Sequence, residues 1–258
     1  MDLKLKNKNA LVCGSTQGIG KATAILLAKE GANVILLARN EEKLKTVLSE
    51  LPRKEQQHNY LVADFSNPED LKIKLEKLNV QFHILINNTG GPAGGPVFKA
   101  NLDEFERAFT MHLKCNHVLA QALVPGMKEF GYGRIINIIS TSVKQPLDGL
   151  GVSNTIRGAV ANWSKTLANE LGQFNITVNN VLPGATSTER LNEIINNKAN
   201  KTGLSVDEVS KNMMNASPAK RFAKPEEVAN AVVFLVSEKA SFINGINVPV
   251  DGGRTKSL

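Results

Sequence analysis

Short β-rich runs alternate along the whole chain with longer stretches whose apolar residues recur at helical spacing, and no other feature constrains the fold as strongly. Strands separated by helices are typical of βαβ units, which build a parallel sheet. Such strands are covered on both faces, and the runs VILLA (34–38) and RIINII (134–139) are largely apolar, as this burial requires. The pattern predicts an α/β fold of Rossmann type, with about seven parallel strands doubly wound by helices on both faces.

The same pattern places each element on the chain. The expected strands are Ala10–Cys13, Asn33–Leu37, Tyr60–Ala63, His83–Ile86, Arg134–Ile139, Thr177–Val181 and Asn247–Val250. The expected helices are Ile19–Glu30, Glu41–Leu51, Pro68–Leu78, Leu102–Phe130, Val152–Leu171 and Pro225–Val236.

No linker rich in Pro, Gly or Ser and no internal repeat divides the chain, so residues 1–258 are predicted to form one domain. The segment Thr186–Phe222 differs from the rest because it is polar, rich in Asn and Lys, and interrupted in its helical pattern. Long insertions in compact domains are usually functional or disordered. We therefore expect residues 186–222 to form a mobile, lid-like insertion over a substrate site.

Composition excludes several classes of protein. The formal net charge is +7, but basic residues are scattered among acidic neighbours and no aromatic-basic RNA motif occurs, so no nucleic-acid partner is expected. Neither a signal peptide nor an apolar run long enough to span a bilayer is visible, which favours a soluble, cytoplasmic protein without a membrane partner. Cys13 and Cys115 both lie in apolar patterns, and we expect both to be reduced.

A glycine-rich loop follows the first expected strand and leads into the first helix. It reads Gly14-Ser15-Thr16-Gln17-Gly18-Ile19-Gly20. Glycines there permit a tight turn and let backbone N–H groups at a helix N-terminus approach a phosphate. An ordinary βα turn that contains glycine is the alternative. The position of the loop in the first βαβ unit favours nucleotide binding.

The spacing G-x-x-x-G-x-G resembles that of the short-chain dehydrogenase/reductase family, and further motifs of that family follow in order. They are Asp64 and Phe65 after the third strand, Asn87-Asn88-Thr89-Gly90 after the fourth, Pro183-Gly184 with Thr188 after the sixth, and Asp251-Gly252-Gly253 near the end. The resemblance is closest to the 3-oxoacyl-(acyl carrier protein) reductase branch. It implies a Rossmann-fold oxidoreductase of carbonyl or alcohol substrates. Cofactor contacts are expected from Gly14, Ser15, Gln17, Gly18, Ile19, Gly20, Asp64, Phe65, Asn88, Gly90, Pro183, Gly184 and Thr188.

The end of the second strand bears on the choice of cofactor. An acidic residue there would bind the ribose 2′-OH of NAD, whereas an Arg can pair with the 2′-phosphate of NADP. The sequence has Arg39 and no acid at this point, which favours NADP(H). A solvated Arg39 remains the alternative, because Gln17 stands where many NADP-dependent relatives carry a second basic residue.

The catalytic pattern of the family is only partly retained. Ser140 matches the family serine after the fifth strand, but Ser153 stands at the tyrosine position thirteen residues later and Arg157 at the lysine position. His112 falls at the asparagine position. A Ser hydroxyl is far less acidic than a phenol, and Arg does not shuttle protons, although it can hydrogen-bond a ribose or substrate oxygen.

Two readings of His112 stay open. A protonated His112 could supply the proton that the family takes from tyrosine, with Ser140 and Arg157 polarising the substrate carbonyl. Alternatively, His112 packs in a helix contact. His112, Cys115 and His117 are close in sequence, but only the first two share a helix face and no acidic ligand joins them, so no metal site is expected.

Two functions follow. The first is an NADP(H)-dependent oxidoreductase of a small-molecule carbonyl or acyl thioester, with altered proton delivery. The second is an NADP(H)-binding sensor or scaffold without turnover. The resemblance also implies a homodimer or homotetramer built on two apolar helix faces. Those faces carry Leu113, Val118, Leu119 and Leu123, and Ile156, Val160, Trp163 and Leu167.

Overall fold

The computed structural model describes residues 1–257, and at its centre lies a seven-stranded sheet in the order β3-β2-β1-β4-β5-β6-β7. Every neighbouring pair of strands is parallel. The strands are β1 (Asn9–Cys13), β2 (Asn33–Ala38), β3 (Asn59–Val62), β4 (Ile84–Asn87), β5 (Gly133–Ile138), β6 (Ile176–Pro183) and β7 (Asn247–Val250). The predicted Rossmann-type sheet is confirmed.

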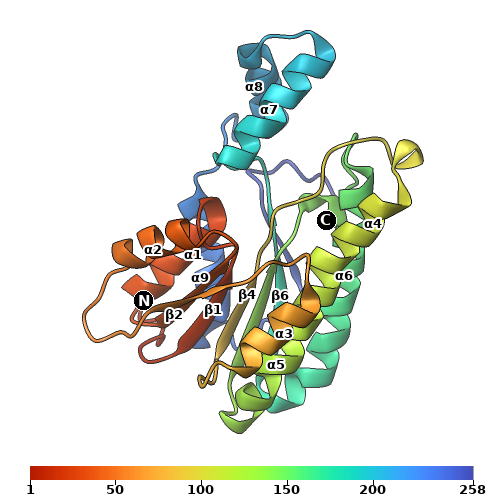
Figure 1. Ribbon diagram of the computed structural model, residues 1–258. Helices are drawn as coiled ribbons and strands as arrows, with labels where there is room; N and C mark the ends of the chain where they lie inside the picture. The colour runs from red at the N-terminus through yellow and green to blue at the C-terminus, as the bar shows by residue number, and fades with distance from the viewer. Residues whose placement is uncertain (258) are drawn as a thin grey trace.

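Helices cover both faces of this sheet (Figure 1). One side carries α1 (Gly18–Lys29), α2 (Glu41–Glu50) and α9 (Pro225–Val236); the other carries α3 (Pro68–Glu76), α4 (Leu102–Phe109), α5 (Cys115–Glu129) and α6 (Gly151–Leu171). Short 3₁₀ turns occupy Val97–Lys99, Thr141–Val143, Gly172–Phe174 and Glu238–Ala240. The strand order reverses between β1 and β4, and at such a point the carboxyl edge of a doubly wound sheet opens into a crevice.

The apolar strands bury both of their faces. In β1, Ala10 and Val12 belong to the core beneath α1 and α9, whereas Leu11 and Cys13 belong to the core beneath α3 and α5. This division follows from the two-residue side-chain period of a strand. It explains why strand runs of this chain are continuously apolar instead of alternating.

The helix predicted over Leu102–Phe130 is not uniform. A π-helical segment, Thr110–Lys114, separates α4 from α5 without ending the helical path. Single π turns of this kind are frequent at functional sites, because they rotate the following side chains relative to the α-helical period. Hydrophobic spacing does not reveal one inserted residue, so the sequence predicted a single helix.

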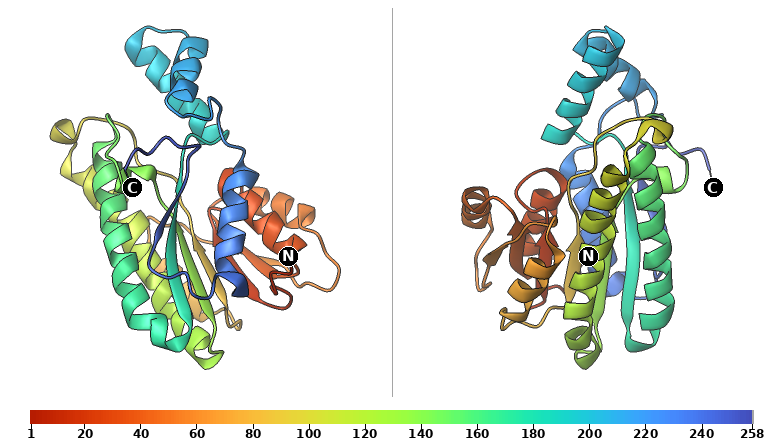
Figure 2. Two further views of the ribbon diagram at one scale, coloured as in Figure 1. Left: turned by 180° about the vertical axis from the view of Figure 1, so that it is seen from behind. Right: turned by 45° about the vertical axis from the view of Figure 1, so that its right-hand side comes forward.

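The insertion after β6 is an ordered helical hairpin. α7 (Glu189–Thr202) and α8 (Val206–Asn215) pack on each other around Leu191, Ile195, Ala199 and Val209. The hairpin projects beyond the carboxyl edge of the sheet in each view (Figures 1 and 2). Its own small apolar core accounts for the interrupted pattern, because only one face of each short helix needs to be apolar.

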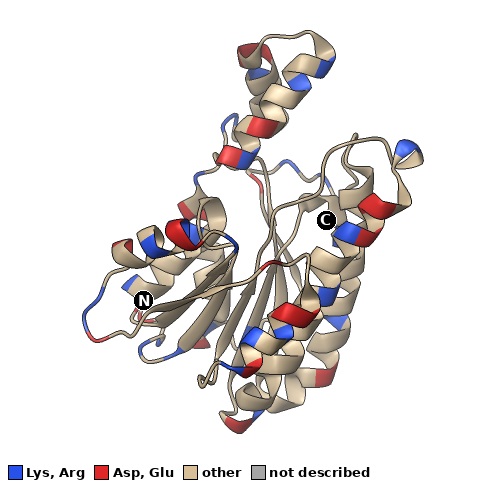
Figure 3. Cartoon of the chain, in the orientation of Figure 1, with Lys and Arg blue, Asp and Glu red and all other residues tan. Residues whose placement is uncertain are grey.

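The surface matches the composition. Lys and Arg lie among Asp and Glu over the helices, and the sheet interior carries few charges (Figure 3). Cys13 and Cys115 are both free and buried, as predicted. Within residues 1–257, no helix has the length and hydropathy needed to cross a membrane.

Candidate active site

The glycine loop lies between β1 and α1 and takes a shape that favours glycine. Gly14 and Gly18 have φ values of +59° and +55°, in the left-handed region. A Cβ atom on Gly20 would lie 2.2 Å from the carbonyl oxygen of Gly14. The helix therefore begins directly against the turn, and any side chain at Gly20 would force the two apart.

The N-terminus of α1 is left available to an anion. Gln17 is the N-cap in an extended conformation, its side chain forms no capping hydrogen bond, and the first turn contains no acidic residue. Free N–H groups at a helix N-terminus attract phosphate. Two other residues of the predicted cofactor set face inward: the Ser15 hydroxyl donates to the Leu37 carbonyl (3.4 Å), and Ile19 packs against the core.

Motifs distant in sequence meet at this loop. The Asn88 side chain, after β4, donates to the carbonyl oxygens of Cys13 (3.4 Å) and Gly14 (3.3 Å). Thr188, the N-cap of α7, lies beside Gly18, since a Cβ on that glycine would sit 3.0 Å from the Thr188 methyl. The structure thus brings the predicted motifs after the first, fourth and sixth strands to one edge of the sheet.

The remaining predicted contacts line this edge. Gly90 follows Asn88 and is exposed; Pro183 ends β6; and Gly184 packs so closely that a Cβ would lie 2.7 Å from the Asp251 Cα. Such contacts explain the residue types without any ligand, so the roles of these residues toward a cofactor stay predictions.

Two further residues occupy the rim of the same edge. Arg39 directly follows β2, is exposed, and belongs to none of the ion pairs within residues 1–257. Asp64 follows β3 and accepts the Ser66 N–H (2.9 Å). The Phe65 ring is buried in the core, and its carbonyl accepts the Cys115 thiol (3.1 Å), so this residue offers a ligand no free side chain.

The four predicted catalytic residues converge from three elements. Ser140 follows β5, and its Oγ accepts the Ser142 N–H (3.1 Å). Ser153 lies in the first turn of α6 and Arg157 one turn further on, so the two share a helix face. His112 comes from the π segment, next to Arg157.

Arg157 is a buried cation. Its side chain points inward, Nη1 donates to the Ile138 carbonyl (3.1 Å), and the residue is only 8% exposed. Nη2 would lie 3.7 Å from a Cβ added to Gly91, while Nε has no hydrogen-bond partner. Burial lowers the pKa of the guanidinium to about 10, which leaves it charged near neutral pH.

His112 is 2% exposed and stays neutral near pH 7. Burial and the neighbouring Arg157 charge lower its pKa to about 2, although a hydrogen bond with the Gly90 backbone opposes them. The protonated imidazole considered from the sequence therefore lacks support. Sequence spacing placed the histidine near the site but contained no information on its burial beside a second cation.

His112, Cys115 and His117 do not come together as metal ligands. His117 turns away from His112, and its Nδ1 accepts the Trp163 indole N–H (3.4 Å). No cluster of three His, Cys, Asp or Glu side chains able to hold a metal ion occurs in the described part of the chain.

Sequence reasoning missed the contacts that join the loops around this edge of the sheet. The loops after β4 and before α6 join through hydrogen bonds of Gly95 with Gly149 (2.7 Å) and Gly151 (3.0 Å). Arg190 of the hairpin donates to the Pro92 carbonyl (3.0 Å). The Lys256 N–H of the C-terminal tail donates to the Gln145 side chain (3.3 Å). Among these residues, only the glycines could have been noticed in the sequence, because glycine is typical of loops.

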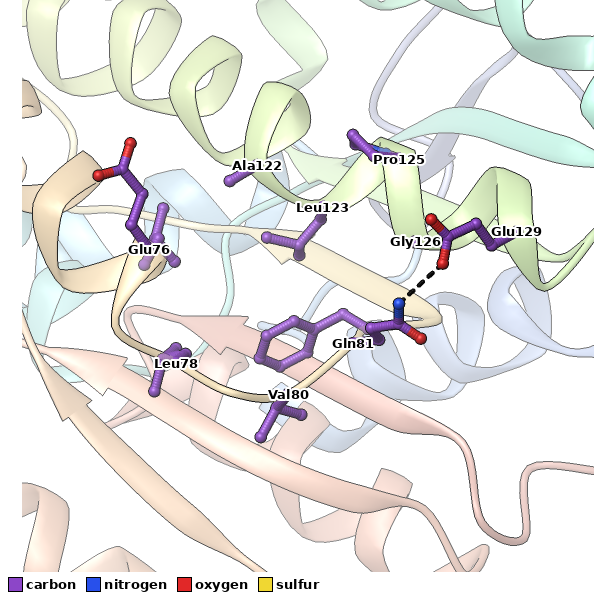
Figure 4. A pocket seen from close by; sticks show the side chains of 11 residues that line it. Glu76, Leu78, Val80, Gln81, Ala122, Leu123, Pro125, Gly126 and Glu129 are labelled. Carbon is purple, nitrogen blue, oxygen red and sulfur yellow. Dashed lines mark hydrogen bonds between the residues drawn. The ribbon is translucent and has the colours of Figure 1, made fainter.

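A separate hollow lies between the loop before β4 and the end of α5, where Gln81 donates to Glu129 (2.8 Å; Figure 4). It is at the amino end of the strands, since Gln81 precedes β4. The glycine loop follows the carboxyl end of β1, so the two lie at opposite edges of the sheet. None of the predicted site residues lines this hollow.

The helix faces proposed for oligomer contacts divide into two sets. Leu119, Leu123, Ile156 and Val160 are buried within the chain itself. Leu113, Val118, Trp163 and Leu167 are only partly buried. The first set therefore packs inside its own chain and leaves no side chain free for a partner.

Comparison with known proteins identifies the family. The family described as enoyl-(acyl carrier protein) reductase matches residues 14–255. L-xylulose reductase of Caenorhabditis elegans is 34% identical over 248 residues, covering 96% of this chain and 95% of that protein. The solved structure of L-sorbose reductase from Gluconobacter frateurii with NADPH and L-sorbose has a TM-score of 0.93 at 33% identity and full coverage of both chains.

A 3-oxoacyl-(acyl carrier protein) reductase of Staphylococcus epidermidis is 30% identical over 253 residues, covering 96% of this chain and 98% of that protein. That branch is therefore one of several activities found at comparable identity, and the comparisons do not select it. The NADPH bound to the sorbose reductase agrees with the NADP(H) prediction. The protein belongs to the short-chain dehydrogenase/reductase family, as its sequence motifs indicated.

Proposed function

We propose that this protein is an NADP(H)-dependent oxidoreductase that interconverts a carbonyl compound and its alcohol by an altered route of proton delivery. The observation that carries this proposal is the convergence of Ser140, Arg157 and the glycine loop at one carboxyl edge of the sheet. A 3-oxoacyl thioester is the first substrate to test, because the sequence motifs resemble those of that branch most closely.

The residues at this edge fit the cofactor. The turn at Gly14, Gly18 and Gly20 lets the pyrophosphate approach the N-terminus of α1, and Arg39 is free to pair with the 2′-phosphate. Asp64 would contact the adenine, and one of the spare N–H groups of Arg157 would contact the nicotinamide ribose. NADPH, when bound, supplies a hydride to the carbonyl carbon.

The chain's own groups act on the carbonyl oxygen. The Ser140 hydroxyl donates a hydrogen bond to it, and the positive charge of Arg157 stabilises the oxyanion as negative charge develops. Ser153 is shorter than a tyrosine, which leaves room for a water molecule that delivers the proton. Neutral His112 orients this water and carries no net charge. In sum, carbonyl, NADPH and one proton give alcohol and NADP⁺.

A cofactor-binding sensor or scaffold is the second candidate. Ser153 favours it, because without a phenol the site has no group of suitable acidity within reach of the carbonyl. In that case NADPH would bind and remain intact.

The decisive experiment combines titration with turnover. Purified protein is titrated with NADPH and NADH, and NADPH absorbance is then followed with a 3-oxo thioester and with a ketose. The proposal expects binding of NADPH and substrate-dependent loss of absorbance. Binding without loss would favour the sensor, and absence of binding would exclude both candidates.

Arg39→Ala tests the cofactor assignment. Loss of a charge-assisted hydrogen bond costs about 1.5–3 kcal/mol, so the Kd for NADPH should rise about 10- to 100-fold while that for NADH stays unchanged. Arg53→Ala, at another exposed arginine, is the matched control. An equal effect on both nucleotides would remove Arg39 from the phosphate site.

Restoring the family pair tests the route of proton delivery. Ser153→Tyr with Arg157→Lys should raise turnover of a simple 3-oxo thioester. A folded double variant that binds NADPH yet shows no gain would contradict the proposal that only the proton donor has changed.

We also propose a homodimer or homotetramer in which α5 and α6 pack against a second copy. The partly exposed Leu113, Val118, Trp163 and Leu167 support it. Light scattering after size-exclusion chromatography gives the mass directly, and a monomer at micromolar concentration would refute it.

A further inference from the structure

Arg157 lacks the negative charge that a buried cation normally has. The eight ion pairs within residues 1–257 do not include it, and its only hydrogen bond goes to a neutral carbonyl. Transferring a guanidinium from water into a protein interior costs several kcal/mol unless an anion compensates. A buried charge without a protein partner is therefore a candidate for ligand binding.

The bound cofactor leaves this charge unbalanced. In the proposed function, the pyrophosphate lies at the N-terminus of α1 and the 2′-phosphate at Arg39. The nicotinamide ribose near Arg157 offers only neutral hydroxyls. The missing anion must therefore belong to the other molecule in the site, which is the substrate.

The geometry limits where that anion can lie. Arg157 binds the carbonyl of Ile138, and Ser140, which holds the substrate carbonyl, is two residues further along the same segment, or roughly 6.6 Å at strand spacing. Two hydrogen bonds of about 3 Å take up most of this distance. The anionic group and the reacting carbonyl must then be close neighbours in the substrate.

Part of the Arg157 guanidinium has no hydrogen-bond partner in the described chain. Its Nη2 faces Gly91, which has no side chain, and Nε has no partner among the described residues. A guanidinium presents its N–H groups as a fork that matches the two oxygens of a carboxylate. His112 is neutral and does not compete for the anion.

Two further lysines belong to the loop after Ser140 and to the tail bound to that loop. Lys144 follows the 3₁₀ turn that begins after Ser140, and the Lys256 backbone is bound to Gln145 of the same loop. Neither lysine forms an ion pair within residues 1–257. Positive charges at the entrance of a cleft raise the local concentration of an anionic substrate.

We propose that the substrate is a 2-oxo or 3-oxo acid whose free carboxylate binds to Arg157 while Ser140 holds the neighbouring carbonyl. This inference rests on the proposed carbonyl reductase function and defines its substrate class. It departs from the thioester substrates of the 3-oxoacyl branch, in which the carboxyl group is esterified and carries no charge.

A binding experiment tests it without requiring turnover. Oxamate, an unreactive carboxylate analogue of a 2-oxo acid, and oxamide, its neutral counterpart, are titrated into the NADP⁺-saturated protein by calorimetry. We expect oxamate to bind at least 10-fold more tightly than oxamide. Equal affinities would overturn the proposal.

Variants assign the effect to Arg157. Arg157→Gln should remove the preference for oxamate, and Arg157→Lys should retain part of it, because lysine keeps the charge but loses the fork. Arg53→Gln, at an exposed and distant site, should behave as the unchanged protein. Circular dichroism verifies that each variant is folded; a preference that survives in folded Arg157→Gln would contradict the assignment.

A turnover arm separates this inference from the proposed function. Acetoacetate should be reduced and its methyl ester should not. Reduction of the ester alone would overturn the carboxylate inference and leave the reductase function standing. Arg157-dependent binding of oxamate without reduction of either ketone would do the opposite, because the anion site would stand in a protein that does not turn over.

Discussion

Burial keeps the His112 imidazole neutral at a pH where an exposed histidine would be partly protonated. His112 and Arg157 share one enclosed space, so protonating the histidine would place two cations side by side in a region of low dielectric. The site therefore holds one permanent positive charge and one neutral imidazole. This combination favours binding of an anion over donation of a proton.

The depressed pKa of His112 makes folding sensitive to acid. A histidine has a pKa of 6.5 when unfolded and His112 about 2 when folded, so its contribution to stability is full above pH 6.5 and is lost as the pH falls below that value. At pH 5 the loss is roughly 2 kcal/mol from this residue. His83, with a pKa lowered to about 4, acts in the same direction.

Urea unfolding between pH 7 and pH 5 measures how steeply the free energy of unfolding falls as the pH is lowered. His112→Asn should flatten this pH dependence by about one proton, because the variant lacks the imidazole that only the unfolded chain protonates in this range. Identical slopes in the unchanged protein and in His112→Asn would contradict the neutral buried histidine.

The sequence predicted which residues belong to the candidate site, but not the directions of their side chains. The family motifs predicted that Ser140, Ser153, Arg157 and His112 lie in one site. They did not foresee that Arg157 turns inward to the Ile138 carbonyl, because side-chain direction depends on the loop at Gly91 and on the π segment.

Among the elements, the turn from β1 into α1 has the least tolerance for change. Gly20→Ala would place a Cβ within 2.2 Å of the Gly14 oxygen, and relief of that overlap must displace the turn. We expect a loss of about 1–3 kcal/mol in stability and at least a 10-fold weaker Kd for NADPH.

Gly158→Ala is the matched control. Position 158 lies inside α6, where nothing approaches within 4 Å of an added Cβ, so alanine should stabilise the helix by about 0.5–1 kcal/mol. Thermal unfolding and nucleotide titration of both variants test the contrast; equal behaviour would refute the steric argument.

The helical hairpin shows which signals the sequence contained. Leu191, Ile195 and Ala199 recur every four residues, and Ser205 with Glu208 forms a capping box at the start of α8. Both are helix signals that the polar composition of residues 186–222 obscured. The two helices and their packing were consequently missed, and the lid role remains a prediction.

Arg190 provides a test of that role, because it is the contact between the hairpin and the loop at Pro92 (3.0 Å). Arg190→Ala should raise the KM for the carbonyl substrate several-fold, leave the Kd for NADPH unchanged, and speed amide hydrogen exchange in α7 and α8. Lys201→Ala, on the exposed end of α7, is the control. An unchanged KM would argue against closure of the hairpin over the site.

Across the whole molecule, apolar periodicity predicted the elements but not how they pair. All seven predicted strands are present, and most limits agree within one or two residues, as in β6, where the run Thr177–Val181 extends to Ile176–Pro183. The order β3-β2-β1-β4-β5-β6-β7 depends on contacts between segments far apart in sequence, which local patterns do not encode.

Part of that pairing is specified by a row of four asparagines. Asn87, Asn137, Asn180 and Asn247 stand opposite one another on β4 to β7, and side-chain hydrogen bonds of 2.8, 2.9 and 2.8 Å join them in sequence. A slip of one residue would turn each amide to the other face of its strand and break the row. The row thus favours a single register of β4 to β7.

Asn137 is the central member, only 1% exposed, and it also donates to the Ser164 hydroxyl of α6 (3.2 Å). Asn137→Ala removes three hydrogen bonds and leaves the Asn87 amide and the Asn180 carbonyl buried without these partners. Each such group costs about 1–3 kcal/mol, so the free energy of unfolding should fall by about 2–6 kcal/mol. Asn247→Ala, at the end of the row, should cost about 1 kcal/mol, because only one bond is lost.

A double variant tests whether the asparagines act together. In Asn137→Ala with Asn180→Ala, the second substitution removes an acceptor that is already without its donor. The loss of stability in the double variant should therefore be smaller than the sum of the losses in the two single variants. Strict additivity in denaturant unfolding would mean that the four asparagines act independently and do not fix the register together.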